Sequence, residues 1–197
     1  MKKLFMLAIL GALALSGCAP REPANIAAEF ITADGETLWL ATNEAVDFYF
    51  YYPENFIMDK NAAMISIFIS DHELIENELG PEIYQSLYIN PNLSVTVFTL
   101  RGGHANAEQY WSEYVLPSLN EVFSDLFIES SEDIEIAGIV GRKYVYTMSL
   151  SGQEYRQAQV IFFRNNEVYH LTYTATPARF DRHSRVLDIV VETFAFR

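Results

Sequence analysis

The C-terminal half of the chain alternates apolar and polar residues over three segments that are separated by turn-forming residues. Apolar side chains occupy alternate positions in 144–150, in 158–162 and in 169–173. Because successive side chains of a β-strand point to opposite faces of a sheet, this period of two predicts strands with one buried face. Ser151-Gly152 and Asn165-Asn166 separate the segments, and both pairs favour tight hairpin turns. These residues predict an antiparallel meander of three strands.

The N-terminal half contains further strand patterns of the same kind. Strands are expected at Phe30–Thr32, Thr37–Ala41, Val46–Tyr52, Ile65–Ile69 and Val95–Thr99. Asp34-Gly35 favours a hairpin turn between the first two. Asp71–Asn90 has five acidic residues together with Gly80 and Pro81, and this composition predicts a short helix followed by an irregular loop.

Two segments change to the spacing of amphipathic helices. The first is Ala105–Leu126, whose expected buried face consists of Ala107, Trp111, Tyr114, Val115, Leu119, Val122 and Leu126. Pro117 lacks a backbone N–H, so we expect it to divide this helix and to start the second piece. Thr176 and Pro177 predict the N-cap and first residue of a C-terminal helix. Thr193–Phe196 is then expected to return to the sheet.

Strand meanders combined with one central and one terminal helix predict an α+β fold, an antiparallel sheet flanked by helices. A parallel, doubly wound fold is disfavoured because strands and helices do not alternate strictly. The chain also has no Gly-rich turn between a strand and a helix.

The N-terminus has the residue order of a secretory signal. Lys2 and Lys3 precede an uncharged run, Leu4–Leu15. A helix of this run covers about 18 Å, less than the roughly 30 Å hydrocarbon core that a membrane-spanning helix must cross. Leu15, Ser16, Gly17 and Cys18 resemble the lipobox of bacterial lipoproteins, in which the cysteine sulfur takes a diacylglyceryl group and the cysteine becomes the first residue.

This resemblance implies that the chain has three parts and that the protein lies in the cell envelope. We expect residues 1–17 to be a lipoprotein signal peptide, residues 18–27 a tether, and residues 28–197 one folded domain. The protein would be exported to the cell envelope and held at the membrane through the lipid on Cys18. The expected location is the outer face of the cell membrane, or the outer membrane if the host is Gram-negative.

Composition narrows the function classes further. Loss of residues 1–17 leaves 11 basic against 26 acidic side chains, a net charge of −15. This charge disfavours nucleic acid as a partner and repels anionic lipid head groups, so we expect membrane attachment to come from acyl chains. Cys18 is the only cysteine, so its acylation leaves no thiol for a disulfide or for catalysis. No motif indicates a cofactor.

Two stretches of sequence resemble PsbP-like domains. Phe48–Pro53 followed by Phe56 is similar to that family's opening aromatic strand, and Tyr169–Thr176 with Val190–Phe194 is similar to its last strand and helix. The resemblance spans about Val46 to Phe196 and implies an α/β/α sandwich built on an antiparallel sheet. It also implies a binding or assembly role, because known relatives are mostly binding or assembly factors.

The candidate metal ligands form incomplete patterns. His72, Glu73 and Glu76 read His-Glu-x-x-Glu, whereas the zincin pattern has a second histidine where Glu76 stands. A solvated acidic helix explains the same residues. A second acidic cluster, comprising Glu129, Glu132, Asp133 and Glu135, lacks the spacing of a calcium loop, and we expect a solvated loop there.

Arg179, Arg182 and Arg185 recur at every third position of the C-terminal helix. They form a candidate face for a partner protein. The alternative is local pairing, since Asp181 and Asp188 lie four and three residues from Arg185.

The sequence therefore favours a non-enzymatic lipoprotein of the cell envelope, a binding or assembly module whose favoured partner is an envelope protein, with a small ligand as the less favoured alternative. The alternatives are a hydrolase-like envelope enzyme and a weak metal-binding module. A concave pocket that holds a histidine and a carboxylate within hydrogen-bond reach would favour the enzyme. Of the histidines, His170 is expected in mid-strand on the face opposite Tyr169, Leu171 and Tyr173.

Overall fold

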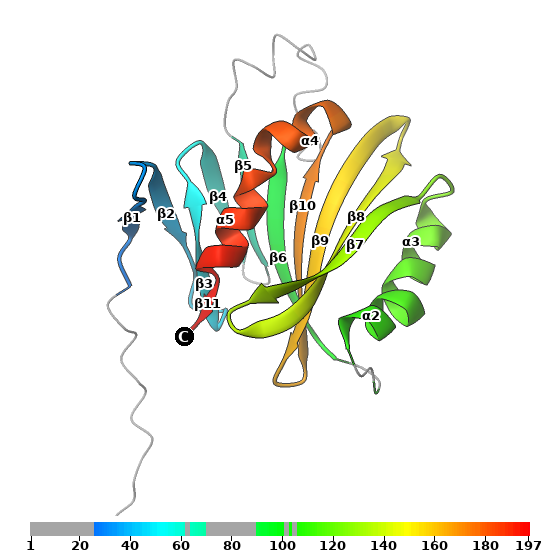
Figure 1. The fold of residues 1–197 in the computed structure, drawn as a ribbon, viewed down its shortest axis with the longest axis horizontal. Coiled ribbons are helices and arrows are strands. Elements are labelled where there is room, and N and C mark those ends of the chain that lie inside the picture. The colour runs from blue at the N-terminus through cyan, green and yellow to red at the C-terminus, as the bar shows by residue number, and fades with distance from the viewer. Residues whose placement is uncertain (1–25, 62–63, 70–89, 101–102, 104–105) are drawn as a thin grey trace, which may run out of the picture.

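The main element of the protein is a seven-stranded antiparallel sheet (Figure 1). The computed structural model describes residues 26–61, 64–69, 90–100, 103 and 106–197. In spatial order the strands are β4 (Phe56–Asn61), β5 (Met64–Ile69), β6 (Asn92–Thr99), β10 (Glu167–Ala175), β9 (Gln153–Arg164), β8 (Ile139–Leu150) and β7 (Phe127–Ile136). The predicted C-terminal meander joins the N-terminal strands where β10 pairs with β6.

A second, four-stranded sheet brings the two ends of the domain together. Its order is β1 (Glu29–Ile31), β2 (Thr37–Ala41), β3 (Phe48–Pro53) and β11 (Ala195–Phe196). The predicted return of the C-terminus to a sheet is confirmed, because Ala195 lies opposite Tyr49 of β3.

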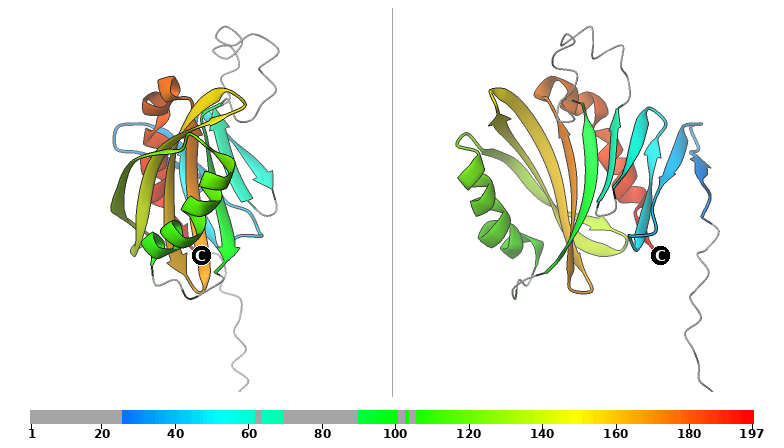
Figure 2. Two further views of the ribbon diagram at one scale, coloured as in Figure 1. Left: turned by 90° about the vertical axis from the view of Figure 1, so that its right-hand side faces the viewer. Right: turned by 180° about the vertical axis from the view of Figure 1, so that it is seen from behind.

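Helices cover both faces of the large sheet, as the edge-on view in Figure 2 shows. One face carries α2 (Ala107–Tyr110), the π-helical segment η1 (Trp111–Val115) and α3 (Leu116–Val122). The other carries α4 (Pro177–His183) and α5 (Arg185–Thr193). The predicted α+β class, an antiparallel sheet flanked by helices, is confirmed.

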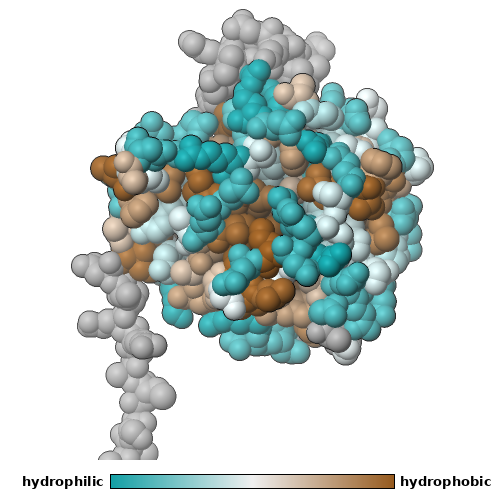
Figure 3. Space-filling model, in the orientation of Figure 1, coloured by the Kyte–Doolittle hydropathy of each residue, from teal (hydrophilic) through white to brown (hydrophobic). Residues whose placement is uncertain are grey.

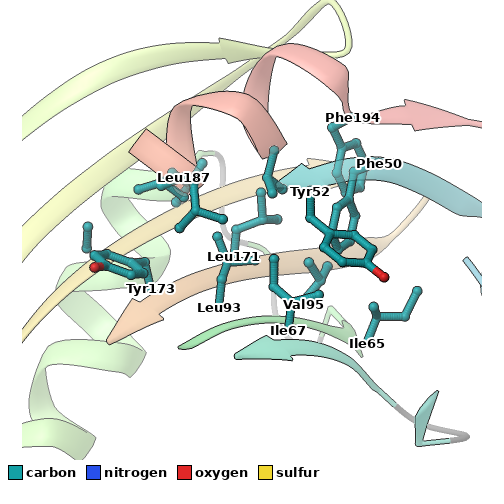
Figure 4. Packing of buried hydrophobic residues seen from close by; sticks show 14 of the residues in the cluster. Phe50, Tyr52, Ile65, Ile67, Leu93, Val95, Leu171, Tyr173, Leu187 and Phe194 are labelled. Carbon is teal, nitrogen blue, oxygen red and sulfur yellow. The ribbon is translucent and has the colours of Figure 1, made fainter. Parts of the chain in front are cut away.

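Strand alternation sorts the side chains of the large sheet between two cores. Tyr169, Leu171 and Tyr173 of β10 point toward α4 and α5, where Figure 4 shows Leu187 of α5 above Leu171. Val168 and His170, one position out of phase, lie on the face of α2 and η1. A shift of one residue would exchange these two sets, so burial on both faces fixes the register.

The predicted hairpin turns are present. Ser151, Asn165 and Asn166 have φ of 53°, 49° and 64°, the left-handed values that tight two-residue turns require. Asparagine tolerates this region better than most residues do, because its short side chain bonds locally to the backbone.

The acidic cluster after the central helix lies on a strand, so the predicted loop is wrong, although most of the cluster is exposed to solvent as expected. β7 pairs with β8 along its length, and its carboxylates meet basic partners on neighbouring strands. Glu129 pairs with Arg156, Glu132 with Lys143 and Asp133 with Arg142. Basic residues of β8 and β9 thus pair with three of the four acidic side chains of the cluster.

The central helix buries most of the predicted face, but two of the predicted residues are exposed. Tyr114 and Val122 are 59% and 68% exposed, whereas Tyr110, absent from the prediction, is buried. In η1 the N–H of Leu116 donates to the carbonyl of Trp111, five residues back, and this wider turn shifts the phase of the helix. The expected division of the helix at Pro117 is not observed: hydrogen bonding changes from π-helical to α-helical at Leu116, but the backbone stays helical there, with φ of −60° and ψ of −44°.

The segment after Thr176 is also divided, because α4 and α5 meet at Ser184 instead of forming one continuous helix. The predicted helix and loop in Asp71–Asn90 lie outside the described residues, apart from Asn90 at its end.

Gly141 marks a close approach between β8 and β9. A Cβ at this position would meet the carbonyl oxygen of Ile161 at 2.7 Å and the Cβ of Phe162 at 2.9 Å. We therefore expect Gly141→Ala to lower the free energy of unfolding by about 1–3 kcal/mol, the usual cost of overpacking. Urea unfolding measures this, with Gly103→Ala as control because a Cβ there meets no atom within 4 Å. Equal midpoints for the two variants would contradict the prediction.

Candidate functional site

A cavity of about 470 Å³ lies between the central helix and the large sheet. Its floor comes from Phe98 and Thr99 of β6 and from His170 of β10, and its walls come from Tyr110, Tyr114, Val115, Ser118 and Leu119. We call it the His170 cavity. Small-molecule sites are typically concave, mainly apolar and of this size, with a few polar groups that set the orientation of the ligand.

Packing of Trp111 over β8 places the helix beside this cavity. The Trp111 and Tyr144 rings stack with centroids 3.9 Å apart and an angle of 8° between their planes. Tyr110, the preceding residue, then points toward His170, with ring centroids 5.6 Å apart. Trp111 thus packs the helix against the sheet, and Tyr110 forms one side of the cavity.

His170 is the one titratable group on the cavity floor, among the residues described there. It is 8% exposed, and the Phe98 ring lies edge-on to it at 5.4 Å. Gln159 Nε2 is 3.2 Å from His170 Nδ1, and His170 Nε2 has no hydrogen-bond partner. Burial lowers the pKa of His170 to about 4, because the apolar surroundings disfavour the imidazolium. The ring is therefore neutral at neutral pH.

A row of polar side chains continues from His170 across β9 and β10. The Gln159 amide also donates to Thr172 Oγ1 at 3.2 Å, and its own Oε1 has no partner. Farther along, Gln157 Nε2 donates to Thr174 Oγ1 at 2.9 Å. The row therefore leaves two buried polar atoms, Gln159 Oε1 and His170 Nε2, without a partner among the described residues.

The chemistry of this group favours binding over acid–base catalysis. The partner of His170 is an amide, which cannot stabilise an imidazolium as the carboxylate of a catalytic triad does. A histidine with so low a pKa is a weak base at neutral pH. None of the described lining residues carries a carboxylate, and the Ser118 hydroxyl donates to the Tyr114 carbonyl.

A second hollow, of about 480 Å³, lies beside β3 and β6 and is lined in part by Asp47 and Glu167. Its polar groups are already engaged. Asp47 pairs with Arg164, and the Tyr169 hydroxyl bonds with both carboxylates, at 3.2 Å from Asp47 and 2.9 Å from Glu167. We therefore take the His170 cavity, with its mainly apolar lining, as the candidate site.

The arginines proposed as a partner face lie on α4 and α5. Arg182 is exposed and Arg179 is half-buried. Arg185 pairs with Glu36 at 2.8 Å and with Asp34 at 3.7 Å, so the expected local partners, Asp181 and Asp188, are replaced by the β1–β2 hairpin.

Asp181 itself pairs with Arg156 of β9. Figure 3 shows the face that bears α4 and α5, where apolar patches alternate with hydrophilic residues. The role of the arginines as a docking face stays a prediction.

The remaining predicted site residues lie outside the described part of the chain. These are the lipobox residues Leu15, Ser16 and Gly17, the lipidation site Cys18, and the candidate metal ligands His72, Glu73 and Glu76. Among the residues that the structure does describe, no group of three or more His, Cys, Asp or Glu side chains is placed to hold a metal ion.

Sequence reasoning placed His170 on the correct strand face but did not connect it with the central helix. The predicted buried face of the helix does not include Tyr110. The pair Tyr110 and Tyr114, one turn apart, was the available signal. Only the structure shows Tyr110 against His170 and Tyr114 at the mouth of the cavity.

Comparison with known proteins identifies the fold. No family model matches the chain, and no curated protein matches it. Among solved structures, cyanobacterial PsbP (CyanoP) from Synechocystis sp. PCC 6803 is similar with a TM-score of 0.55 and 13% identity, over 93% of this chain and 99% of that one. The Ran-binding protein Mog1p of Saccharomyces cerevisiae has a TM-score of 0.59 and 10% identity, over 82% and 96%.

LpqN, described as involved in cell envelope biogenesis of Mycobacterium tuberculosis, has a TM-score of 0.52 and 10% identity, over 85% of this chain and 88% of that one. At such identities the likeness concerns the backbone and carries no activity with it. The chain therefore has a PsbP-like fold, shared with Mog1p and LpqN.

Proposed function

We propose that the protein is a non-enzymatic binding module of the cell envelope, anchored through acylated Cys18, and that its binding site is the His170 cavity. The observation that carries this proposal is a concave, mainly apolar cavity whose lining includes a buried, neutral histidine. Such a site can hold a ligand in one orientation, whereas its described residues offer no carboxylate for acid–base chemistry.

The structural neighbours support this proposal at the level of the fold. One is described as a Ran-binding protein and another as involved in cell envelope biogenesis. A sheet with helices on both faces has room for a site beside a helix without disturbing the opposite core. In this chain the opposite core contains the packed residues of β3, α4 and α5.

The anchoring part of the proposal rests on the N-terminal sequence. No helix in the described ranges has the length and apolarity to cross a membrane. The eight residue steps from Cys18 to Ile26 reach at most about 29 Å when extended. The tether would therefore hold the domain near the membrane, although its acidic surface favours distance from anionic lipids.

Cys18→Ser is expected to release the protein from the membrane. The native chain, expressed in a bacterium, should incorporate labelled palmitate and sediment with membranes, because two or more acyl chains anchor a protein stably. The variant should lose both properties, since serine provides no thiol for the diacylglyceryl group. Ser16→Ala keeps a small residue in the lipobox and is the matched control. Labelling that persists in Cys18→Ser would contradict the anchor.

An envelope protein remains the proposed partner, and site-specific crosslinking in intact cells tests it. A photo-crosslinking amino acid at Tyr114, which is exposed and lines the cavity, should capture that partner. The same amino acid at Val122, on the same helix but outside the lining, should not. Equal capture at both positions would place the partner elsewhere.

A further inference from the structure

We propose that the β1–β2 hairpin rests in the interfacial layer of the membrane that holds the acyl chains of Cys18, with Phe30, Ile31 and Trp39 as its contact residues. This proposal rests on the acylation of Cys18 in the proposed function and adds to it the surface of the domain that faces the lipid. Its supports are the exposure of these side chains, the point where the tether joins the domain and the charge of the hairpin.

The hairpin exposes three large hydrophobic side chains. Phe30 of β1 is 49% exposed, Ile31 is 61% exposed and Trp39 of β2 is 40% exposed. None of the three belongs to either hydrophobic core of the domain. Single exposed apolar side chains are ordinary on a protein surface, but several gathered on one hairpin mark a contact surface.

These side chains lie on both faces of the hairpin. Phe30 points to the face of Tyr51, and the centroids of the two rings are 5.9 Å apart. The β1–β2 register places Ile31 and Trp39 together on the other face. β1 is the last strand of its sheet, so both faces meet at one edge. A protein surface that covers one face would leave the other in water, whereas a lipid layer surrounds the edge and contacts both.

The tether joins the domain beside this hairpin. The Tyr51 hydroxyl donates to the Ala27 carbonyl at 2.9 Å, which holds the start of the domain against β3. The eight residue steps from Cys18 to Ile26 reach at most about 29 Å. Figures 1 and 2 show β1 and α3 at opposite ends of the molecule. The end that bears the hairpin is therefore the one that the acyl chains hold near the lipid.

The hairpin suits the interfacial layer and not the hydrocarbon core. Tryptophan is enriched at the level of the head groups, because its ring is apolar and its N–H can bond to water or to a head group. The outer edge of β1 pairs with no other strand that the structure describes, so its backbone groups need polar partners. Such groups are not tolerated in hydrocarbon. The hairpin therefore lies at the depth of the head groups.

The charge of the hairpin permits this contact, although the domain as a whole is acidic. Asp34 and Glu36, in the turn between the strands, pair with Arg185 of α5 at 3.7 Å and 2.8 Å. Glu29 is exposed at the start of β1, where its carboxylate stays in the aqueous part of the head-group layer. Acidic surfaces elsewhere on the domain are repelled by anionic lipid, which also turns the hairpin toward the membrane.

A small contact suffices because the anchor is already in the membrane. Once the acyl chains of Cys18 are inserted, docking of the hairpin is an intramolecular step at an effective concentration on the order of 1 mM. The same hairpin on a protein without the anchor must bear the full cost of association. We therefore expect lipid to cover the hairpin only in the acylated protein.

The chain carries its own reporter of this contact. Trp39 and Trp111 are its only tryptophans, and Trp111 is buried against Tyr144. The acylated full-length protein is reconstituted into phosphatidylcholine vesicles, and its emission is quenched with aqueous iodide. The difference between each protein and its Trp39→Phe variant isolates Trp39. The iodide quenching constant of Trp39 should be about threefold lower than in Cys18→Ser protein mixed with the same vesicles, because interfacial lipid covers the ring.

Brominated lipid gives the complementary measurement. Phosphatidylcholine with bromine on the upper acyl carbons should quench Trp39 in the acylated protein and leave Trp111 unaffected, because bromine quenches only on close approach. Trp39→Phe combined with Val122→Trp moves the exposed reporter to α3, where Val122 is 68% exposed. Bromine should quench this matched control about threefold less than it quenches Trp39.

Removal of the contact residues should release the hairpin without releasing the anchor. Phe30→Ser combined with Ile31→Ser should restore the access of iodide to Trp39, while the protein still floats with the vesicles. Tyr114→Ser combined with Val122→Ser is the matched control, since it removes two exposed apolar side chains at the other end of the molecule. Trp39 should stay covered in that control.

If the native protein does not float with the vesicles, the anchor of the proposed function fails, and the docking fails with it. If the protein floats but iodide and bromine reach Trp39 as they reach a tryptophan at position 122, the anchor stands and the docking is overturned. The docking is also overturned if Phe30→Ser with Ile31→Ser leaves Trp39 covered. In either of these last two cases the hairpin is left free for a protein partner.

Discussion

Phe194→Ala is expected to lower the free energy of unfolding by about 3–5 kcal/mol, the usual cost of removing a buried phenylalanine. Phe194 is 3% exposed and joins the end of α5 to β11. The centroid of its ring lies 5.1 Å from that of Phe48 and 5.5 Å from that of Phe162. Figure 4 shows Phe194 next to Phe50. The truncation would leave a cavity where both sheets and α5 meet, so the surroundings have little freedom to collapse into it.

Urea unfolding followed by circular dichroism measures this change. A domain of this size has a total stability of only about 5–15 kcal/mol, so the loss should be a large fraction of it. Phe30→Ala is the matched control, since the Phe30 side chain is 49% exposed and should contribute less than about 1 kcal/mol. A similar loss in both variants would show that burial of Phe194 does not account for its effect.

His170 is expected to make the stability of the domain depend on pH between about 4 and 6.5. Burial lowers its pKa from 6.5 to about 4, so at these pH values the unfolded chain binds a proton that the folded domain does not. Stability therefore rises with pH through this window and is lost as pH falls from 6.5 toward 4. The full loss is about 3 kcal/mol at 1.36 kcal/mol for each unit of pKa.

His170→Phe removes this titration and serves as the comparison. The pKa of His183 is also lowered, mainly by burial, and carboxylates titrate near the lower limit, but these groups are common to both proteins. The difference in unfolding free energy between native and variant protein, measured in urea at pH 4 to 7, isolates His170. Native and variant curves that stay parallel would contradict the prediction.

Most strands could be predicted because their signals are local. Alternation at 144–150 and 169–173, together with the left-handed turn residues Asn165 and Asn166, depends on the backbone of a few neighbouring residues. Thr37–Ala41 was predicted with the bounds that β2 has. These elements needed no information from the rest of the chain.

The misassigned elements are those whose stability comes from elsewhere in the chain. β7 has an acidic, mostly exposed sequence that resembles a loop, and it becomes a strand through pairing with β8 and through bases such as Arg156. The helix around Trp111 contains a π-helical segment, and the Trp111 ring stacks on Tyr144 of β8. This segment departs from the regular spacing of an α-helix. Neither effect is visible in the local pattern.

From residue pattern alone followed the α+β class, the meander and the position of His170 on the face of its strand opposite Tyr169, because local periodicity and turn residues decide them. The tertiary structure alone decided what faces His170. The cavity exists because a helix centred near residue 111, a strand near residue 98 and a strand near residue 170 meet there. Contacts between segments so far apart depend on how three layers pack, and no local propensity encodes that packing.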